Sequence, residues 1–356
     1  MRVLYLLNRA QNGRIGAIRR GEESDNHLYG MLRLPEYGVE TGYLEIEQYL
    51  PEWLSGFLRR RLLNIYWAHL PLFPKFFSYD AVFSSTAFGS QFFHTLYPFK
   101  KPKWIMLDFS LMGLLGEEKT LKQKLLAFMV ARAAGIVTID AHEKVALEGR
   151  FPSLKGKVEF LRFAVDTESF RPHPEIPEED FIFSPGRDPG RDFKTLFQAV
   201  RGLDARTVLT ARSGTIQKLA PLPPGVTNAS FTPEEYIVTL AKAGIVVIPL
   251  DTRNGINNAM GISTLVEAMA AGKAVIATRT YSTESYIKDG VNGLLLPEGD
   301  EESLKRAILE LRRNHEARQR LGLAAREFAL TDCEAEKFAN SLALYFLRLF
   351  SDESTN

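Results

Sequence analysis

The amino-acid sequence predicts an α/β fold built from two doubly wound, Rossmann-like domains. With 356 residues, the chain is longer than one ordinary hydrophobic core, so two domains are expected. Short apolar runs alternate with longer segments of helical periodicity, which is the pattern of parallel sheets with crossover helices. A stretch with three prolines, residues 170–180, lies near the middle and suits a linker.

The apolar runs fall into two series, one on each side of this stretch. The first series predicts strands at 2–7, 81–85, 103–107, 135–139 and 158–163, with a helix at 121–134. The second predicts strands at 180–185, 206–211, 244–250, 274–278 and 293–297, with helices near 193–202, 233–242, 262–271 and 301–313. We therefore expect domains at 1–165 and 166–330. A terminal helix at 331–350 either packs on its own domain or crosses back to the first.

Composition limits the class of protein. The chain is 45% hydrophobic and 24% charged, as in soluble globular proteins, and no apolar run approaches the roughly 20 residues of a membrane span. The first apolar run is too short for the core of a signal peptide. Cys333 is the only cysteine, which suits a reducing compartment. These features predict a cytoplasmic protein, with peripheral contact to a membrane left open.

Charge is distributed unevenly along the chain. The net charge of +1 gives no support to nucleic-acid binding. Residues 1–165 carry 22 Lys and Arg against 16 Asp and Glu, whereas residues 166–356 carry 22 against 27. The basic first half is compatible with an acidic partner, such as a phosphorylated acceptor or a membrane surface.

The segment 261–278 has the features of an anion-binding helix. Gly261 precedes a run of strong helix formers, and Gly272 stands where a left-handed residue ends the helix. Ser263, Thr264 and Glu267 share one side of this helix. The free N–H groups of a helix N-terminus bind anions, and a carboxylate one turn later suits a vicinal diol such as a ribose. A lone helix Glu is more often a solvent-facing residue.

This segment resembles a known signature. Residues 261–304 are similar to the donor site of the family 4 glycosyltransferases, which are retaining enzymes of the GT-B fold with two domains facing each other across a cleft. The resemblance implies that Glu267 binds the ribose of a UDP- or GDP-sugar. Where the family has an earlier Glu that meets the donor sugar, this chain has Ala259. Backbone N–H groups at Gly261 and Ile262, or the side chains of Asn257 and Asn258, are the candidate substitutes.

The resemblance continues upstream, at residues 181–199. It implies that Gly186, Arg187 and Arg191 clamp the donor diphosphate. The physical reading agrees, because the arginines follow a strand end in a loop rich in Gly and Pro, and guanidinium groups match phosphate oxygens. The alternative is a pair of solvated arginines, or ion pairs with neighbouring aspartates. Glu284 matches a further family Glu, whose role the resemblance leaves less defined.

The N-terminal domain offers fewer candidates. Gly13 and Gly16 fall in the predicted first loop, where they either approach the donor phosphates or only form turns. A helix capped by Ser24 or Asp25 is predicted to follow. Asp108, at a strand end, either binds a sugar or acceptor hydroxyl or caps a turn; the family often has a His there.

Residues 51–77 mix aromatic and basic side chains. They include Trp53, Phe57, Trp67 and Phe73 with the basic run Arg59–Arg61. Such a helix either contacts a membrane interface or packs its apolar face on the core with a basic outer face. A lipid-linked acceptor would bring this segment to a membrane.

The sequence thus predicts a glycosyltransferase that needs no cofactor other than its nucleotide-sugar substrate. The missing dinucleotide fingerprint disfavours a nicotinamide-dependent dehydrogenase, and the chain has no D-x-D for a metal-bound donor, no His/Cys cluster and no nucleophile elbow. The acceptor is a glycan, a lipid-linked molecule or a small molecule. Two alternatives remain: a nucleotide-sugar epimerase, and a catalytically silent nucleotide-sugar-binding subunit, which Ala259 keeps open.

Overall fold

The computed structural model describes residues 1–7, 11–61, 66–99, 101–253 and 259–351. The chain forms two compact units, and each contains one parallel six-stranded sheet. The first unit comprises Met1–Gly21, His27–Leu161 and Glu336–Asn356, and the second comprises Glu22–Asn26 and Arg162–Ala335. The boundary lies between Leu161 and Arg162, so the proline-rich stretch 170–180 leads into the second sheet from within the second unit. Among the described residues, no helix has both the length and the apolar character needed to cross a bilayer.

The first sheet has the strand order β2-β1-β3-β4-β5-β6. Its strands are β1 (Arg2–Leu6), β2 (Glu40–Tyr43), β3 (Ala81–Ser84), β4 (Lys103–Asp108), β5 (Gly135–Thr138) and β6 (Val158–Phe160). The helices of this unit are α1 (Asn12–Arg19), α2 (Glu52–Arg61), α3 (Phe88–Leu96), α4 (Leu111–Leu115), α5 (Leu121–Val130), α6 (Ala141–Arg150) and α14 (Ala335–Ser351), with a 3-10 segment η4 (Leu70–Ser78).

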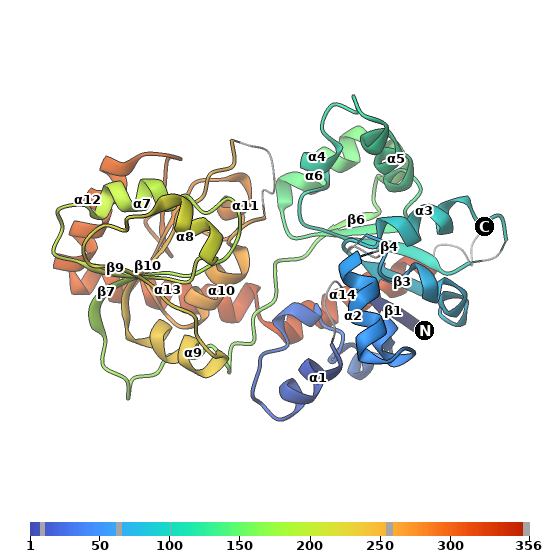
Figure 1. Ribbon diagram of the computed structural model, residues 1–356, viewed down its shortest axis with the longest axis horizontal. Coiled ribbons are helices and arrows are strands. Elements are labelled where there is room, and N and C mark those ends of the chain that lie inside the picture. The colour runs from blue at the N-terminus through green and yellow to red at the C-terminus, as the bar shows by residue number, and fades with distance from the viewer. Residues whose placement is uncertain (8–10, 62–65, 100, 254–258, 352–356) are drawn as a thin grey trace. The chain divides into compact units, whose positions relative to one another are not determined.

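The terminal helix α14 belongs to the first unit (Figure 1). Its aromatic side chains cover the sheet: the ring of Phe346 lies 5.5 Å from that of Phe83, and both residues are buried. The hydroxyl of Tyr345 donates to the carbonyl of Lys157 (2.6 Å), beside the edge strand β6. The aromatic side chains of α14 therefore supply part of the first core.

The second sheet has the order β12-β11-β10-β7-β8-β9. Its strands are β7 (Glu179–Ser184), β8 (Arg206–Leu209), β9 (Val226–Asn228), β10 (Ala243–Ile248), β11 (Val275–Thr278) and β12 (Leu294–Leu296). The helices are α7 (Phe193–Val200), α8 (Ser213–Leu219), α9 (Pro233–Lys242), α10 (Ile262–Ala270), α11 (Tyr281–Glu284), α12 (Glu301–Arg313) and α13 (His315–Asp332).

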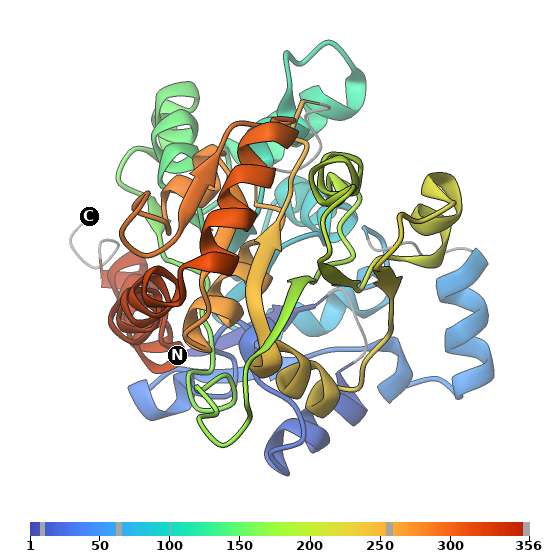
Figure 2. The ribbon, with the colours of Figure 1, turned by 90° about the vertical axis from the view of Figure 1, so that its left-hand side faces the viewer.

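Figures 1 and 2 show this sheet between two helical layers, with α7, α8 and α12 on one face and α9, α10 and α13 on the other. Buried strand residues alternate between the faces. Ile182, Ile245 and Ile276 pack in one cluster with side chains of α7 and α12. The strands of a parallel sheet are buried on both faces, which explains why they read as continuous apolar runs.

The structure confirms the strands and helices that were predicted from a strong sequence periodicity. All ten predicted strands are present, and the four predicted helices of the second series match α7, α9, α10 and α12 within two residues. The edge strands β2 and β9 were not predicted. Their sequences, Glu-Thr-Gly-Tyr and Val-Thr-Asn, are too short and polar to stand out from a loop.

Two predictions for the N-terminal region are wrong. Gly13 and Gly16 lie within helix α1, not in a loop. The predicted helix after Ser24 and Asp25 is replaced by short 3-10 turns at Asn26–Leu28 and Leu34–Tyr37. Glycine is a poor helix former and was therefore read as a turn residue, but a single helical glycine costs only about 1 kcal/mol.

Helix α10 ends as the sequence predicts and is held there by α13. Gly272 adopts a left-handed conformation (φ 69°), and the N–H of Lys273 donates to the carbonyl of Ala268 (3.0 Å). Arg326 on α13 donates from Nη1 to the carbonyl of Ala270 (2.8 Å), which is the last residue of α10. A Cβ added to Gly322 of α13 would overlap the carbonyl oxygen of Gly272.

This packing gives a stability prediction. Gly322→Ala should lower the melting temperature because its methyl group pushes α13 away from the backbone of Gly272, a strain of about 1–3 kcal/mol. Gly214→Ala, in helix α8 with nothing within 4 Å of the added Cβ, is the control and should leave stability unchanged or raise it by up to about 1 kcal/mol. Thermal melting by circular dichroism checks both. Equal effects of the two variants would contradict the tight α13–α10 packing.

Candidate functional site

The topology of the second sheet marks one place for a ligand. The chain starts at β7, adds β8 and β9 on one side, and then returns to add β10 on the other side of β7. Doubly wound sheets bind ligands at such a switch point, beyond the carboxyl ends of the two central strands. The segment after β7 is the loop 185–192, and the segment after β10 leads to α10. Of the residues predicted from the sequence, Gly186, Arg187 and Arg191 lie on the first connection, and Gly261 to Glu267 lie on the second.

Arg191 is the central side chain of this crevice. Its side chain has 0% exposure, and Nη2 donates to Oγ1 of Thr264 (2.7 Å). Nε lies 3.5 Å from a carboxylate oxygen of Asp188, while Nη1 has no hydrogen-bond partner among the described residues. Burial lowers the pKa of Arg191 from its ordinary value, although the nearby carboxylate of Asp188 opposes that shift. A buried guanidinium with unused donors is suited to bind an anion.

Glycine at position 186 allows the guanidinium to lie there. Gly186 has φ 130°, and a Cβ at this position would overlap the guanidinium of Arg191. The N–H of Gly186 donates to Oγ1 of Thr210 (2.7 Å) on the connection after β8. At the other end of the loop, the N–H of Asp192 donates to the carbonyl of Pro249 (3.0 Å), after β10. The loop is therefore fixed between three strand ends.

Helix α10 begins beside this arginine. Its N-cap, Gly261, is left-handed (φ 79°) and has no side chain of its own to cap the first-turn amides, which include those of Ile262, Ser263 and Thr264. Ile262 is buried, whereas Ser263 and Thr264 are half-buried. The N-terminal amides and helix dipole attract negative charge on the side where Thr264 meets Arg191. The cation and the helix N-terminus therefore form one anion-binding arrangement.

Glu267 lies one turn further along α10 and is almost fully buried (7% exposed). Its Oε2 accepts a hydrogen bond from the hydroxyl of Tyr236 on α9 (2.9 Å). Burial raises the pKa of Glu267 to about 7, against the opposing effects of Tyr236, Asn26 and Arg191. Burial and the Glu267 carboxylate also raise the pKa of Tyr236 well above its ordinary value. The carboxylate is thus held in place but only partly ionised near neutral pH.

Together these groups can hold a ligand with an anionic end and a polar, hydroxyl-bearing end. Arg191, Thr264 and the first-turn amides of α10 serve the anion. Glu267, fixed by Tyr236, can accept hydrogen bonds from hydroxyl groups about one helical turn away. This is the arrangement that a nucleoside diphosphate needs.

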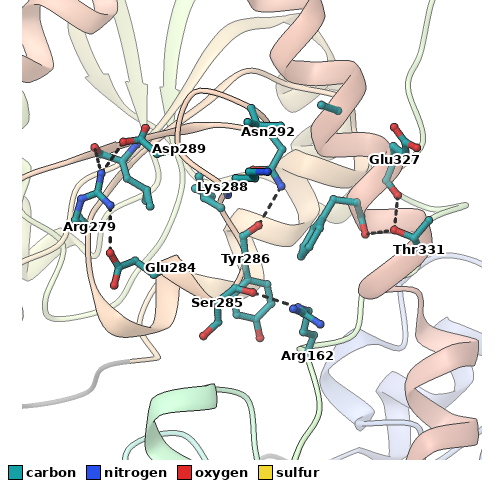
Figure 3. A pocket seen from close by; sticks show the side chains of 15 residues that line it. Arg162, Arg279, Glu284, Ser285, Tyr286, Lys288, Asp289, Asn292, Glu327 and Thr331 are labelled. Atoms are coloured by element: carbon teal, nitrogen blue, oxygen red, sulfur yellow. Dashed lines mark hydrogen bonds and ion pairs between the residues drawn. The ribbon is translucent and has the colours of Figure 1, made fainter.

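Three other predicted residues are not among the contacts just described. Arg187 is exposed, on the same loop after β7 as the buried Arg191. Glu284, at the end of α11, pairs with Arg279 (3.1 Å). Figure 3 shows Glu284 on the wall of an open cavity of about 650 Å³, together with Lys288 and Asp289. Gly13, on helix α1, has nothing within 4 Å of an added Cβ.

Asp108 closes strand β4 of the first unit, as predicted, and caps the turn that follows. Its Oδ1 accepts hydrogen bonds from the N–H groups of Ser110 (2.8 Å) and Leu111 (2.7 Å), at the start of α4. The residue is buried, and burial together with the nearby carboxylate of Glu143 raises its pKa well above the ordinary value. The interpretation that Asp108 caps a turn is therefore confirmed.

Two candidates lie outside the described residues, and some contributors were missed. Asn257 and Asn258, proposed as substitutes for the family's earlier Glu, are not described; Ala259 lies in a turn. Within the described ranges, no group of three or more His, Cys, Asp or Glu is arranged to hold a metal ion. The sequence did not identify Tyr236 or Asn26 as neighbours of Glu267, because both are remote along the chain.

Part of the chain matches a known protein family. Residues 218–328 match the family model described as glycosyl transferases group 1. An uncharacterized glycosyltransferase of Methanocaldococcus jannaschii is 29% identical over 116 residues, which are 32% of this chain and 28% of that protein. A second one from the same organism is 45% identical over 64 residues, 18% of each chain. The alignments thus span less than a third of these curated relatives.

Solved structures resemble the chain over nearly its whole length. Sucrose-phosphate synthase from Thermosynechococcus elongatus has a TM-score of 0.72 at 17% identity and covers 99% of both chains. Anabaena HepE in complex with UDP-glucose has a TM-score of 0.72 at 12% identity and covers 98% of this chain and 99% of that one. These similarities establish the fold, and the predicted GT-B class with two doubly wound domains is confirmed.

The buried carboxyl group of Glu267 predicts how the stability of the protein depends on pH. The pKa of Glu267 is raised from 4.5 to about 7, so this group holds its proton more tightly in the folded state than in the unfolded state. The contribution of this protonation to the free energy of unfolding is greatest below pH 4.5 and is lost as the pH rises through 7. Glu267→Gln should therefore be more stable than the wild type at pH 8, by on the order of 3 kcal/mol, with a smaller gain at pH 5. Melting curves at the two pH values test this. A gain that is the same at both would show that Glu267 is not a buried, ionising group.

Proposed function

We propose that the chain transfers a sugar from a UDP- or GDP-linked donor to an acceptor hydroxyl, because residues 218–328 match the group 1 glycosyl transferase model and the chain has the GT-B fold. The observation that carries the proposal is the buried guanidinium of Arg191, with Nη1 unused among the described residues, beside the N-terminus of α10 at the sheet's switch point. The neighbour solved with UDP-glucose makes UDP-sugars the first donors to test.

In the proposed complex, the donor diphosphate lies between Arg191 and the N-terminal amides of α10. Negative charge develops on the leaving diphosphate as the glycosidic bond breaks, and preorganised cations and N–H groups stabilise it. Arg187, exposed on the same loop, joins on the solvent side. The two arginines supply the neutralisation that a metal ion gives other transferases, so we expect activity in the presence of EDTA.

Glu267 binds the ribose in this proposal, with Tyr236 fixing the carboxylate. The ribose hydroxyls donate to it, so the ionised form binds best. The acceptor side is the first unit, where Asp108 is a candidate contact. We further propose retention of the anomeric configuration, a cytoplasmic location, and a peripheral membrane contact through residues 51–77. Trp53 (73% exposed) and Phe57 (51% exposed) on α2 present the apolar surface for that contact.

Donor binding is the first test. A panel of nucleotide sugars and nucleoside diphosphates is screened by ligand-observed NMR, followed by slow hydrolysis of the best donor. Glu267→Ala and Arg191→Ala should each weaken binding by about tenfold or more, since each removes one or two hydrogen bonds to a charged group. Arg187→Ala should have a smaller effect, and Arg313→Ala, on an exposed face of α12, should have none.

Several outcomes would reject or redirect the proposal. If no nucleoside diphosphate binds, or if folded Glu267→Ala and Arg191→Ala variants bind as the wild type does, the site is not a donor site. Turnover of a UDP-N-acetylhexosamine without any acceptor would identify an epimerase. Donor binding with neither transfer nor hydrolysis would identify a silent binding subunit, the alternative that Ala259 favours.

The pKa of Glu267 gives a second, independent test. With a pKa of about 7, the carboxyl group is mostly protonated at pH 6 and mostly ionised at pH 8, so the affinity for UDP-glucose should rise about tenfold over this interval. UDP-glucose is the suitable probe because its diphosphate is doubly esterified and does not titrate in this range. Glu267→Gln should bind more weakly and without this pH dependence, as measured by titration calorimetry. A wild-type affinity that stays flat between pH 6 and 8 would contradict the assigned role of Glu267.

A further inference from the structure

The first unit contains an apolar groove that the donor site does not use. It has a volume of about 620 Å³ and lies among α3, α4, α5 and residues 66–67. Figure 1 shows α3 and α5 side by side in this unit, and the two helices are in contact. The walls are aromatic and aliphatic side chains, among them Trp67, Phe88, Phe92, Leu121, Leu125 and Met129. This volume lies within the roughly 300–1,000 Å³ of small-ligand pockets.

The aromatic wall of the groove is already in place without a ligand. The ring of Tyr66 stacks on that of Phe88, with centroids 5.5 Å apart and planes 18° apart. The indole of Trp67 lies directly over Gly89, where a Cβ would overlap it, and its ring is in a T-shaped arrangement with that of Phe93, with centroids 6.4 Å apart. Rings held by such contacts cannot easily collapse into the groove.

Apolar side chains are exposed around its mouth and beyond. Leu121 is 74% exposed at the start of α5, and Leu114 is 41% exposed on α4. On α3 and just after it, Phe93 (45%), Leu96 (54%) and Phe99 (69%) are also exposed. Several exposed apolar side chains on helices around one apolar groove favour a site for a partner or a membrane, whereas isolated exposed apolar residues are common.

This apolar surface lies in the most basic part of the chain. Residues 51–132 contain 11 Lys and Arg against 5 Asp and Glu, so their net charge of +6 equals that of the whole N-terminal half. Lys122 lies on the groove itself, with Nζ 5.4 Å from the centre of the Tyr66 ring. The ligand that matches both properties is an amphiphile with an apolar chain and an anionic head.

We propose that this groove binds the apolar chain of a phosphate-bearing lipid acceptor, with Lys122 facing the phosphate. The proposal rests on the proposed function, because it names the class of acceptor. A groove of this volume lined by rings suits a single extended chain, whereas a protein helix would dock on a wider, flatter face. In this arrangement the lipid head lies at the mouth of the groove and the exposed α3 residues face the lipid layer.

The first experiment measures binding of dodecyl phosphate, below its micelle concentration, to the full chain by titration calorimetry. Saturable binding is expected, and Leu121→Glu and Leu125→Glu should weaken it at least tenfold because they place a carboxylate against the chain. Leu323→Glu, at an equally exposed leucine of the second unit (73%), is the matched control and should bind as the wild type does. Lys122→Glu should weaken dodecyl phosphate but not dodecyl maltoside, which has the same chain and a neutral head.

The second experiment uses membranes. The chain should float with phosphatidylglycerol vesicles and much less with phosphatidylcholine vesicles, and Leu121→Glu should reduce flotation severalfold. If flotation is unchanged by Leu121→Glu, the contact is purely electrostatic and the groove proposal is overturned. If inorganic phosphate at equal concentration displaces dodecyl phosphate, the site binds only the anionic head, and the groove proposal is likewise overturned. Binding of a protein partner that Leu121→Glu abolishes, without lipid binding, would also overturn it.

UDP binding measured on the same variants separates this proposal from the proposed function. The groove variants should bind UDP as the wild type does, since no donor-site residue is changed. A wild-type chain that binds UDP but not dodecyl phosphate would overturn the groove and leave the transferase standing. A chain that binds dodecyl phosphate but no nucleotide would remove the proposed function, and with it the assignment of the lipid as an acceptor.

Discussion

The buried guanidinium of Arg191 is the constraint on which the second unit's ligand crevice depends. It takes a permanent cation out of water, which is costly unless hydrogen bonds and a counter-charge compensate. Within the described part of the chain, Thr264 and Asp188 provide only part of this compensation, and donors of the guanidinium stay unused. Gly186 and the start of α10 are shaped around the group. The surrounding fold maintains this incompletely compensated buried charge, and a bound anion, as we propose, would complete the compensation.

Glu267 presents the complementary case on the same helix. Burial without a full counter-charge raises its pKa to about 7, so the folded state carries a carboxyl group that ionises at some cost. Its orientation comes from Tyr236, and the helix that carries it is fixed at its far end by Gly272 and Arg326. Glu267 thus lies on a helix that is fixed at its start by Gly261 and at its end by Gly272 and Arg326. Such rigidity holds two polar groups in register for one ligand with an anionic and a hydroxyl-bearing end.

The first unit has a different chemical character. Its exposed surface around α3 and α5 is aromatic, and its excess of positive charge lies in residues 51–132. One carboxylate oxygen of the buried Asp108 accepts two hydrogen bonds at the start of α4. In our proposals the two units divide the recognition: polar groups of the second bind the nucleotide, and apolar and basic groups of the first bind an amphiphilic acceptor. The transfer of a sugar from a water-soluble donor to a lipid acceptor would need both kinds of surface.

The sequence by itself determined the elements with strong local patterns. The central strands, α7, α9, α10 and α12, and the left-handed stop at Gly272 follow from periodicity and helix-ending residues, and the donor segment was recognisable because its residues are close in sequence. Local patterns did not reveal the short polar edge strands β2 and β9 or the helical place of Gly13. Arg187 and Arg191 were equivalent in sequence, and only the tertiary structure made one exposed and the other buried. Tyr236 and Asn26 reach Glu267 from remote segments, and burial then sets its pKa. Such properties depend on which distant atoms exclude water from a side chain, and packing alone decides that.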